Sequence, residues 1–130
     1  KSGTRVGGGR IFGPRPRNYH FKLNVKTKRL ARKSALSYKV KNNSLLVIED
    51  PKLKDIKTKD FKSLISDLKL ENDKVLMILG EKNDSVYLSS RNLKKIKVVT
   101  ADSVNTYDVL NAGKVVMVKS SIEAIEKILN

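Results

Sequence analysis

The chain has 130 residues, 39% of them hydrophobic, which is enough to bury the core of one domain. Its 28 Lys and Arg against 13 Asp and Glu give a formal net charge of +15, which favours a polyanionic partner, either a nucleic acid or an anionic membrane surface. The lack of cysteine excludes disulfides and thiolate metal sites and fits a reducing cytoplasm, and no apolar run approaches the ~20 residues of a membrane-spanning helix.

Residues 1–23 predict an extended basic arm. They contain five glycines and two prolines, which disfavour regular structure, and their few apolar residues are scattered. The whole stretch 1–41 holds 13 Lys and Arg and no acidic residue, because the first acid is Glu49. The other 15 basic residues face all 13 acids, a balance of +2. A solvated surface normally mixes both signs, so this segregation indicates specific polyanion binding by the first third of the chain.

A helix is expected from Asn24, as its N-cap, to about Val40. At about 100° per residue, one face gathers apolar and small side chains and is predicted to be buried. Its members are Leu30, Ala31, Ser34, Ala35 and Tyr38. The opposite face is predicted to offer cations, and it carries Lys28, Arg29, Arg32, Lys33 and Lys39.

The rest of the chain alternates short apolar runs with helical patterns. Runs at 44–49, 75–79, 96–100 and 115–118 suit strands buried on both faces of a parallel sheet, with Val47 and Ile78 in its core. Helices are expected between and after them, one from a Thr58 cap to Leu68 and others at 85–93 and 103–110. A further helix after 118 would begin at a capping box of Ser120 and Glu123. This order predicts an α/β domain at 24–130, a three-layer αβα fold with a mostly parallel sheet of about four strands, preceded by the arm.

Features that would indicate catalysis or small-molecule binding are weak. Gly7, Gly8, Gly9 and Gly13 do not form a phosphate-cradling loop, because no strand precedes them and prolines follow instead of a helix. His20 is the only histidine and has no nucleophile or carboxylate near it in sequence. No cluster of His, Asp and Glu has metal-ligand spacing. We therefore expect no catalytic residue, metal, cofactor or small-molecule substrate.

One alternative fold reading comes from the ends of the strands. Glu49 and Asp50 end the first predicted strand, and Lys119 ends the fourth, as in a receiver-like phosphoacceptor switch domain. The acceptor aspartate of such a domain should end a middle strand, but the second strand ends at Gly80 and Glu81. Acids at strand ends are commonly loop residues, so this alternative ranks below a nucleic-acid-binding module.

The segment from Gly8 to Tyr19, GGRIFGPRPRNY, resembles the GGG-x-x-FGP-[KR]-PR-x-Y segment of the bacterial family of large-subunit ribosomal protein four. Further matches follow in order: Lys22 to Asn24, RLARKSAL from Arg29, Lys57 to Lys59, VYLSSRNL from Val86, and KVVM from Lys114. The resemblance covers the whole chain. It implies a protein that binds large-subunit rRNA early in assembly, with a globular α/β domain on the outside of the subunit and a long loop that reaches the exit tunnel. The family's N-terminal segment and outgoing half of this loop have no counterpart here, so we expect the chain to start on the returning half.

The sequence and the resemblance together predict a structural constituent of the large ribosomal subunit that binds rRNA and supports assembly and translation. It is expected to be cytoplasmic, to sit on the ribosome beside neighbouring large-subunit proteins, and to have no enzymatic activity and no membrane partner. The expected phosphate contacts are Arg5, Arg10, Arg15, Arg17, Lys22, Lys26, Lys28, Arg29, Arg32, Lys33 and Lys39. Phe12 and Tyr19 are expected to stack on bases. A second, weaker basic cluster is formed by Arg91, Lys94 and Lys95. The alternatives are another nucleic-acid-binding module, including one for DNA, and the receiver-like switch domain.

Overall fold

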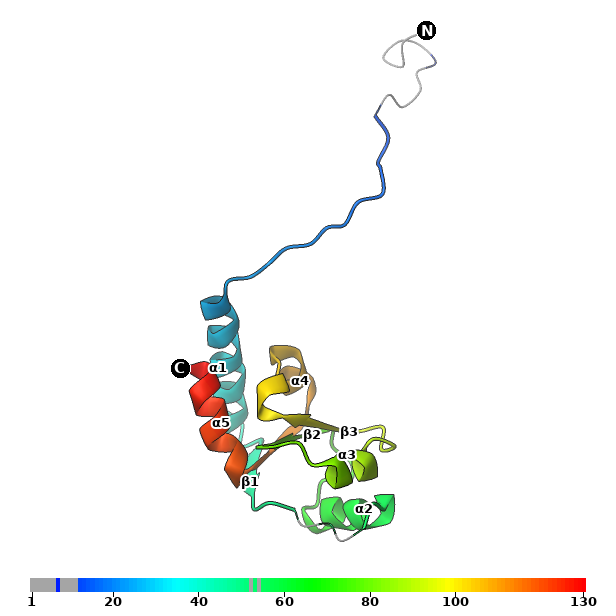
Figure 1. Ribbon diagram of the computed structural model, residues 1–130, viewed down its shortest axis with the longest axis vertical. Helices are drawn as coiled ribbons and strands as arrows, with labels where there is room; N and C mark the ends of the chain where they lie inside the picture. Colours follow the sequence, from blue (N-terminus) through cyan, green and yellow to red (C-terminus); the bar gives the residue numbers. More distant parts are fainter. Residues whose placement is uncertain (1–6, 8–11, 52, 54) are drawn as a thin grey trace.

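The computed structural model describes residue 7 and residues 12–51, 53 and 55–130 (Figure 1). Four parallel strands form one sheet in the order β1-β4-β2-β3. The strands are β1 (Leu45–Ile48), β2 (Val75–Leu79), β3 (Ile96–Thr100) and β4 (Lys114–Val118). All four lie where the apolar runs predict them.

The two central strands are buried on both faces. Every residue of β2 is buried, as is the Val115–Val118 portion of β4, and such continuous apolar runs are typical of a parallel sheet covered on both sides. β2 pairs with both neighbours, Val75 opposite Ile96 of β3 and Lys114 of β4. β1 pairs with β4 alone, Leu45 opposite Val115, and is an edge strand.

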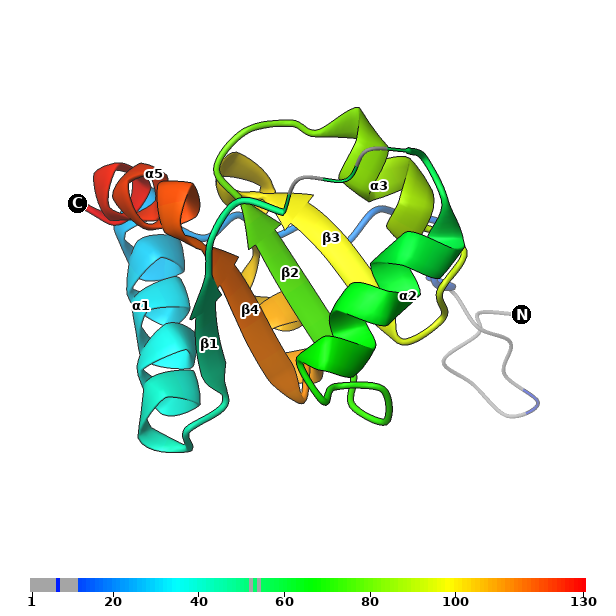
Figure 2. The same ribbon diagram turned by 90° about the horizontal axis from the view of Figure 1, so that it is seen from below.

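Helices cover both faces of the sheet, which confirms the three-layer αβα prediction (Figure 2). One face packs against α1 (Val25–Lys41), the short 3-10 turn η1 (Ala101–Ser103), α4 (Thr106–Asn111) and α5 (Lys119–Leu129). The other face packs against α2 (Thr58–Asp67) and α3 (Asp84–Ser90). None of the helices in the described part of the chain is long and apolar enough to cross a membrane.

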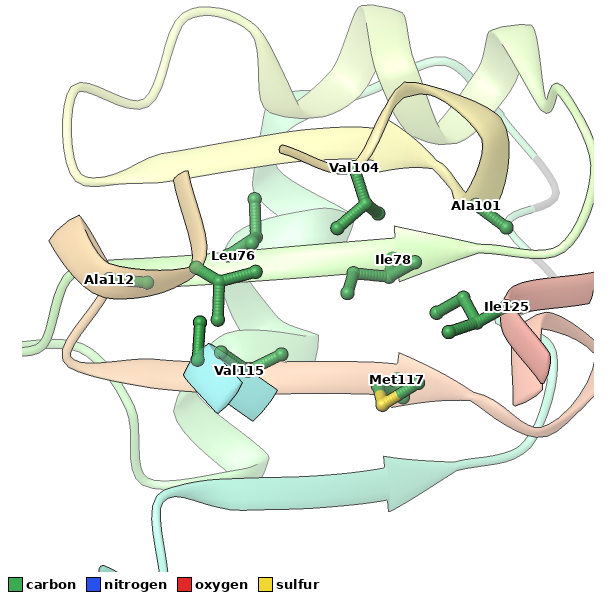
Figure 3. Close-up of a cluster of buried hydrophobic side chains, with 10 residues drawn as sticks. Leu76, Ile78, Ala101, Val104, Ala112, Val115, Met117 and Ile125 are labelled. Atoms are coloured by element: carbon green, nitrogen blue, oxygen red, sulfur yellow. The ribbon is translucent and has the colours of Figure 1, made fainter. Parts of the chain in front are cut away.

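The core consists of two apolar layers separated by the sheet. On the α1 side, Leu76, Ile78, Val115 and Met117 project from β2 and β4 toward η1, α4 and α5 (Figure 3). On the α2 side, the alternate residues of the same strands meet Phe61, whose side chain is fully buried. Because successive side chains of a strand point to opposite faces of the sheet, each central strand contributes residues to both apolar layers.

Three details of the predicted elements are wrong. Val47 is 53% exposed, because β1 lies at the edge of the sheet. Thr58 is the first residue of α2 and not its cap, which is Lys57. The N-cap of α5 is Val118 and lacks a side-chain cap. The hydroxyl of Ser120 instead donates a 2.9 Å hydrogen bond to Asp50, which ties the start of α5 to the end of β1.

Candidate nucleic-acid interface

Residues 12–24 form an extended connection that leads away from α1 without helix or strand (Figure 1). All of their side chains are exposed, including the large rings of Phe12, Tyr19 and Phe21, which are 91%, 72% and 88% accessible. Solvent-exposed aromatic rings among cations are the groups that stack on unpaired bases.

Two of the predicted arm residues form a pair. The guanidinium carbon of Arg17 lies 4.5 Å from the centroid of the Tyr19 ring, a cation–π contact. The guanidinium lies over one face of the ring, an arrangement that joins a group for a phosphate with a group for a base. Arg15 and Lys22 are exposed nearby in sequence. Arg5 and Arg10, also predicted as contacts, lie outside the described residues.

The acid-free stretch stays free of ion pairs within the described chain. Residues 12–41 hold ten Lys and Arg and no Asp or Glu. The ion pairs in the described chain join Lys57 to Asp55, Lys82 to Asp84 and Lys97 to Asp108, all within the α/β part. Ten positive charges therefore lack a carboxylate partner in the fold that the structure describes.

The orientation of α1 differs from the prediction. Of the face predicted to be buried, only Ala35 is buried, at 2% exposure, while Leu30 is 67% and Tyr38 59% exposed. The side that packs on the domain instead carries Ala35 with Leu36 and the half-buried Arg29, Arg32 and Lys39. The predicted division of α1 into an apolar inner face and a cationic outer face is therefore wrong.

The inward cations are held by the domain. Arg29 donates a 3.3 Å hydrogen bond to the carbonyl of Asn130, and the ammonium of Lys39 donates to the carbonyl of Ala112. Arg32 lines a small apolar recess between α1, η1 and α5 together with Leu36 and Ile125. Lys26, Lys28 and Lys33 are exposed and remain available to a partner.

The second basic cluster lies on the other side of the sheet. Arg91 is the C-cap of α3, and Lys94 and Lys95 follow in the connection to β3, all three exposed. Lys95 donates a 3.1 Å hydrogen bond to the carbonyl of Asn72. Lys94 and Lys95 line a groove of about 190 Å³, and Lys62 of α2, which sequence reasoning missed, lines it with them beside the acidic Glu71. Only the packing of α2 against α3 brings it there, and no sequence spacing signals it.

A larger crevice of about 1080 Å³ opens where the carboxyl ends of β1, β2 and β4 meet. Its charged lining comprises Asp50, Glu81, Asp84, Asp102 and Glu123 with Lys82, Lys119 and Lys127. With five acidic residues and three lysines, the crevice would repel the phosphates of a nucleic acid. Among the described residues no three His, Cys, Asp or Glu side chains are grouped to hold a metal ion.

The receiver-like alternative requires an aspartate at the end of a middle strand, and this crevice does not supply one. β2 ends at Leu79, followed by Gly80. The nearest candidate, Asp50, follows the edge strand β1 and accepts the hydrogen bond of Ser120. Asp50 is thus a hydrogen-bonded loop residue, and the exposed cations of residues 12–24 and α1 remain the leading candidate site.

Comparison with known proteins gives a consistent result. The sequence model of the Ribosomal protein L4/L1 family matches residues 1–128. The "Large ribosomal subunit protein uL4" of Parabacteroides distasonis is 56% identical over 122 residues, which are 94% of this chain and 58% of the relative. The proteins of that name from Bacteroides thetaiotaomicron and Cytophaga hutchinsonii are 56% and 51% identical over 95% and 100% of this chain. The chain spans 58–62% of the length of these three relatives.

Proposed function

Because the chain belongs to the Ribosomal protein L4/L1 family, we propose that it is a structural constituent of the large ribosomal subunit that binds rRNA. The observation that carries the proposal is the run of ten cations at 12–41 without a carboxylate partner, followed by residues 42–130, whose 15 basic and 13 acidic residues nearly balance. A phosphate backbone is the partner that such a segment neutralises best.

The proposed mechanism is positioning and not catalysis. Arg15, Arg17 and Lys22 of the arm contact phosphates, and the exposed lysines of α1 extend that contact along the helix. Phe12 and Tyr19 stack on bases that the folded RNA leaves unpaired. The half-buried cations of α1 mainly hold the helix on the domain, and only their exposed atoms can contact RNA. These residues are Arg29, Arg32 and Lys39.

Division of the chain at residue 23 is part of this proposal. The arm at 1–23 is the RNA-binding element, and the α/β domain at 24–130 anchors it to the subunit. The cluster of Arg91, Lys94 and Lys95 gives the domain a weaker contact of its own on the opposite face of the sheet. The names of the relatives support a place on the large ribosomal subunit, and contact with neighbouring large-subunit proteins on cytoplasmic ribosomes is part of the proposal.

Salt titration tests the electrostatic part of the proposal. With eight or so phosphate contacts, affinity for large-subunit rRNA should fall by on the order of 10³–10⁵ between about 50 and 200 mM salt, taking duplex values as a guide. A double variant, Arg15→Ala with Arg17→Ala, should weaken binding and make the salt dependence shallower. Lys119→Ala with Lys127→Ala removes the same charge from the acidic crevice and should leave binding nearly unchanged.

Competition separates this function from its alternatives. Preference for folded rRNA over duplex DNA of equal length supports the ribosomal role, and equal affinity would favour a general nucleic-acid-binding module. Incorporation of phosphate from a small phosphodonor, lost in Asp50→Asn, would favour the switch domain. A salt-independent affinity for rRNA would overturn the proposal itself.

A further inference from the structure

The side of α1 that faces away from the domain carries an ordered row of side chains. Lys26, Leu30, Ser34 and Tyr38 follow at intervals of four residues, so they lie one above another along the helix. All four are exposed, and Ala31 lies beside them, also exposed. α1 lies along one side of the molecule beside β1 (Figure 2), and it packs against α4 and α5.

The row exposes apolar surface that the fold itself does not require. Leu30 is 67% exposed and Tyr38 59%, and they stand two turns apart with only the small Ala31 and Ser34 between them. An isolated exposed leucine needs no explanation, but an aligned aliphatic and aromatic pair on a helix whose only charges are cations can serve as a contact surface for an anionic partner. The small residues between them allow a partner to approach the helix closely.

Charge determines the kind of partner. α1 contains seven Lys and Arg and no Asp or Glu. Lys26 belongs to the row, and Lys33 and Lys41 flank it, all three exposed. A partner must therefore be strongly anionic and also offer apolar surface. A basic protein segment would be repelled, whereas RNA combines phosphates with the faces of riboses and of unstacked bases.

We propose that this outward row of α1 is a second, partly non-electrostatic contact with folded rRNA, where a stem adjoins unpaired nucleotides. Tyr38 stacks on an unpaired base, and Leu30 with Ala31 lies against ribose faces. Lys26, Lys33 and Lys41 pair with the phosphates on either side. The inference rests on the proposed function. It adds contacts with unpaired nucleotides to the phosphate contacts that the charges explain.

The test removes the apolar groups and leaves every charge. The double variant Leu30→Ser, Tyr38→Ser should bind large-subunit rRNA roughly tenfold or more weakly, because loss of one stacked base is commonly that large. Its slope of log affinity against log salt should stay that of the parent, since no ion pair is lost. Both side chains are mostly exposed, so thermal unfolding should not change.

The chain supplies a matched control. Leu110 and Tyr107 of α4 are 58% and 72% exposed, again a leucine and a tyrosine on one helix, with Asp108 between them. Leu110→Ser with Tyr107→Ser should bind rRNA like the parent. Lys26→Ala with Lys33→Ala should weaken binding and also make the salt slope shallower, the opposite signature to that of the apolar variant.

The outcomes separate this inference from the proposed function. Parent-like affinity of the Leu30→Ser, Tyr38→Ser variant would overturn the row as an RNA contact, even if Arg15→Ala with Arg17→Ala still weakens binding. A loss of affinity with an equally reduced salt slope would also overturn it, because the row would then act only by placing its lysines. If the arm variant and the row variant both bind like the parent, the proposed function fails as well.

Discussion

Gly80 occupies a position that leaves no room for a side chain. A Cβ at this position would lie 2.6 Å from the hydroxyl oxygen of Ser120 and 2.9 Å from the backbone carbonyl carbon of the same residue. These distances are shorter than van der Waals contact, and the second involves backbone that cannot rotate away. The end of β2 and the start of α5 can therefore meet only over a residue without a side chain.

Gly80→Ala should lower the free energy of unfolding by about 1–3 kcal/mol, the usual cost of forcing extra atoms into a packed site. Chemical denaturation with parallel thermal melts measures the change. Gly113→Ala is the matched control, since the nearest atom to its Cβ would be 3.5 Å away, and it should change stability by less than about 1 kcal/mol. Equal changes in the free energy of unfolding at the two glycines would show that Ser120 can move away from the added methyl group at little cost.

At the scale of single elements, the sequence predicts the ends of α1 correctly but not the side of the helix that faces the domain. Asn24 is its N-cap and Lys41 its last residue, close to the predicted bounds. The side of α1 that faces the domain includes three basic residues. Arg29 and Lys39 donate hydrogen bonds to the domain, and Arg32 lines a recess between α1 and α5. A helical wheel treats such residues as solvent-facing, and their acceptors lie 101 and 73 residues away in sequence, so no local pattern could reveal them.

Two alanines one turn apart test this orientation. Ala35 is 2% exposed within the core, and Ala31 is exposed. Ala35→Asp should cost several kcal/mol or prevent folding, because it buries a carboxylate without a partner. Ala31→Asp should change the free energy of unfolding by less than about 1 kcal/mol, as solvent-exposed substitutions usually do. Circular dichroism during urea unfolding distinguishes them, and a reversed order would restore the orientation that the periodicity predicts.

At the scale of the whole molecule, the fold class follows from the sequence because β2 and β4 are apolar at nearly every position. Such runs require cover on both faces, which only helices between parallel strands provide. The strand order is not encoded locally, and Val47 shows the consequence. It looks as apolar as Ile78, yet it is 53% exposed because β1 has a neighbour on one side only.

The same pair gives a stability prediction for the sheet. Ile78 is fully buried in the central strand, so Ile78→Asp should abolish the cooperative unfolding transition. Val47→Asp should leave a folded protein that is weaker by about 1 kcal/mol, on the scale of strand propensities. One-dimensional proton NMR reports whether dispersed methyl signals survive. Loss of the fold in Val47→Asp would mean that the edge position is buried in solution.

The pairing of β1 with β4 also bears on how the protein is made. Leu45 finds its partner in Val115, 70 positions later, and β1 pairs with no other strand. Contacts of such high sequence separation form slowly, and the sheet cannot close until β4 has been synthesised. At about 5–20 residues per second, a nascent chain would show its acid-free segment for several seconds before the domain can fold behind it. Over that interval the cations of this segment are open to any nearby polyanion, so early binding to the RNA that we propose as partner would limit non-productive association.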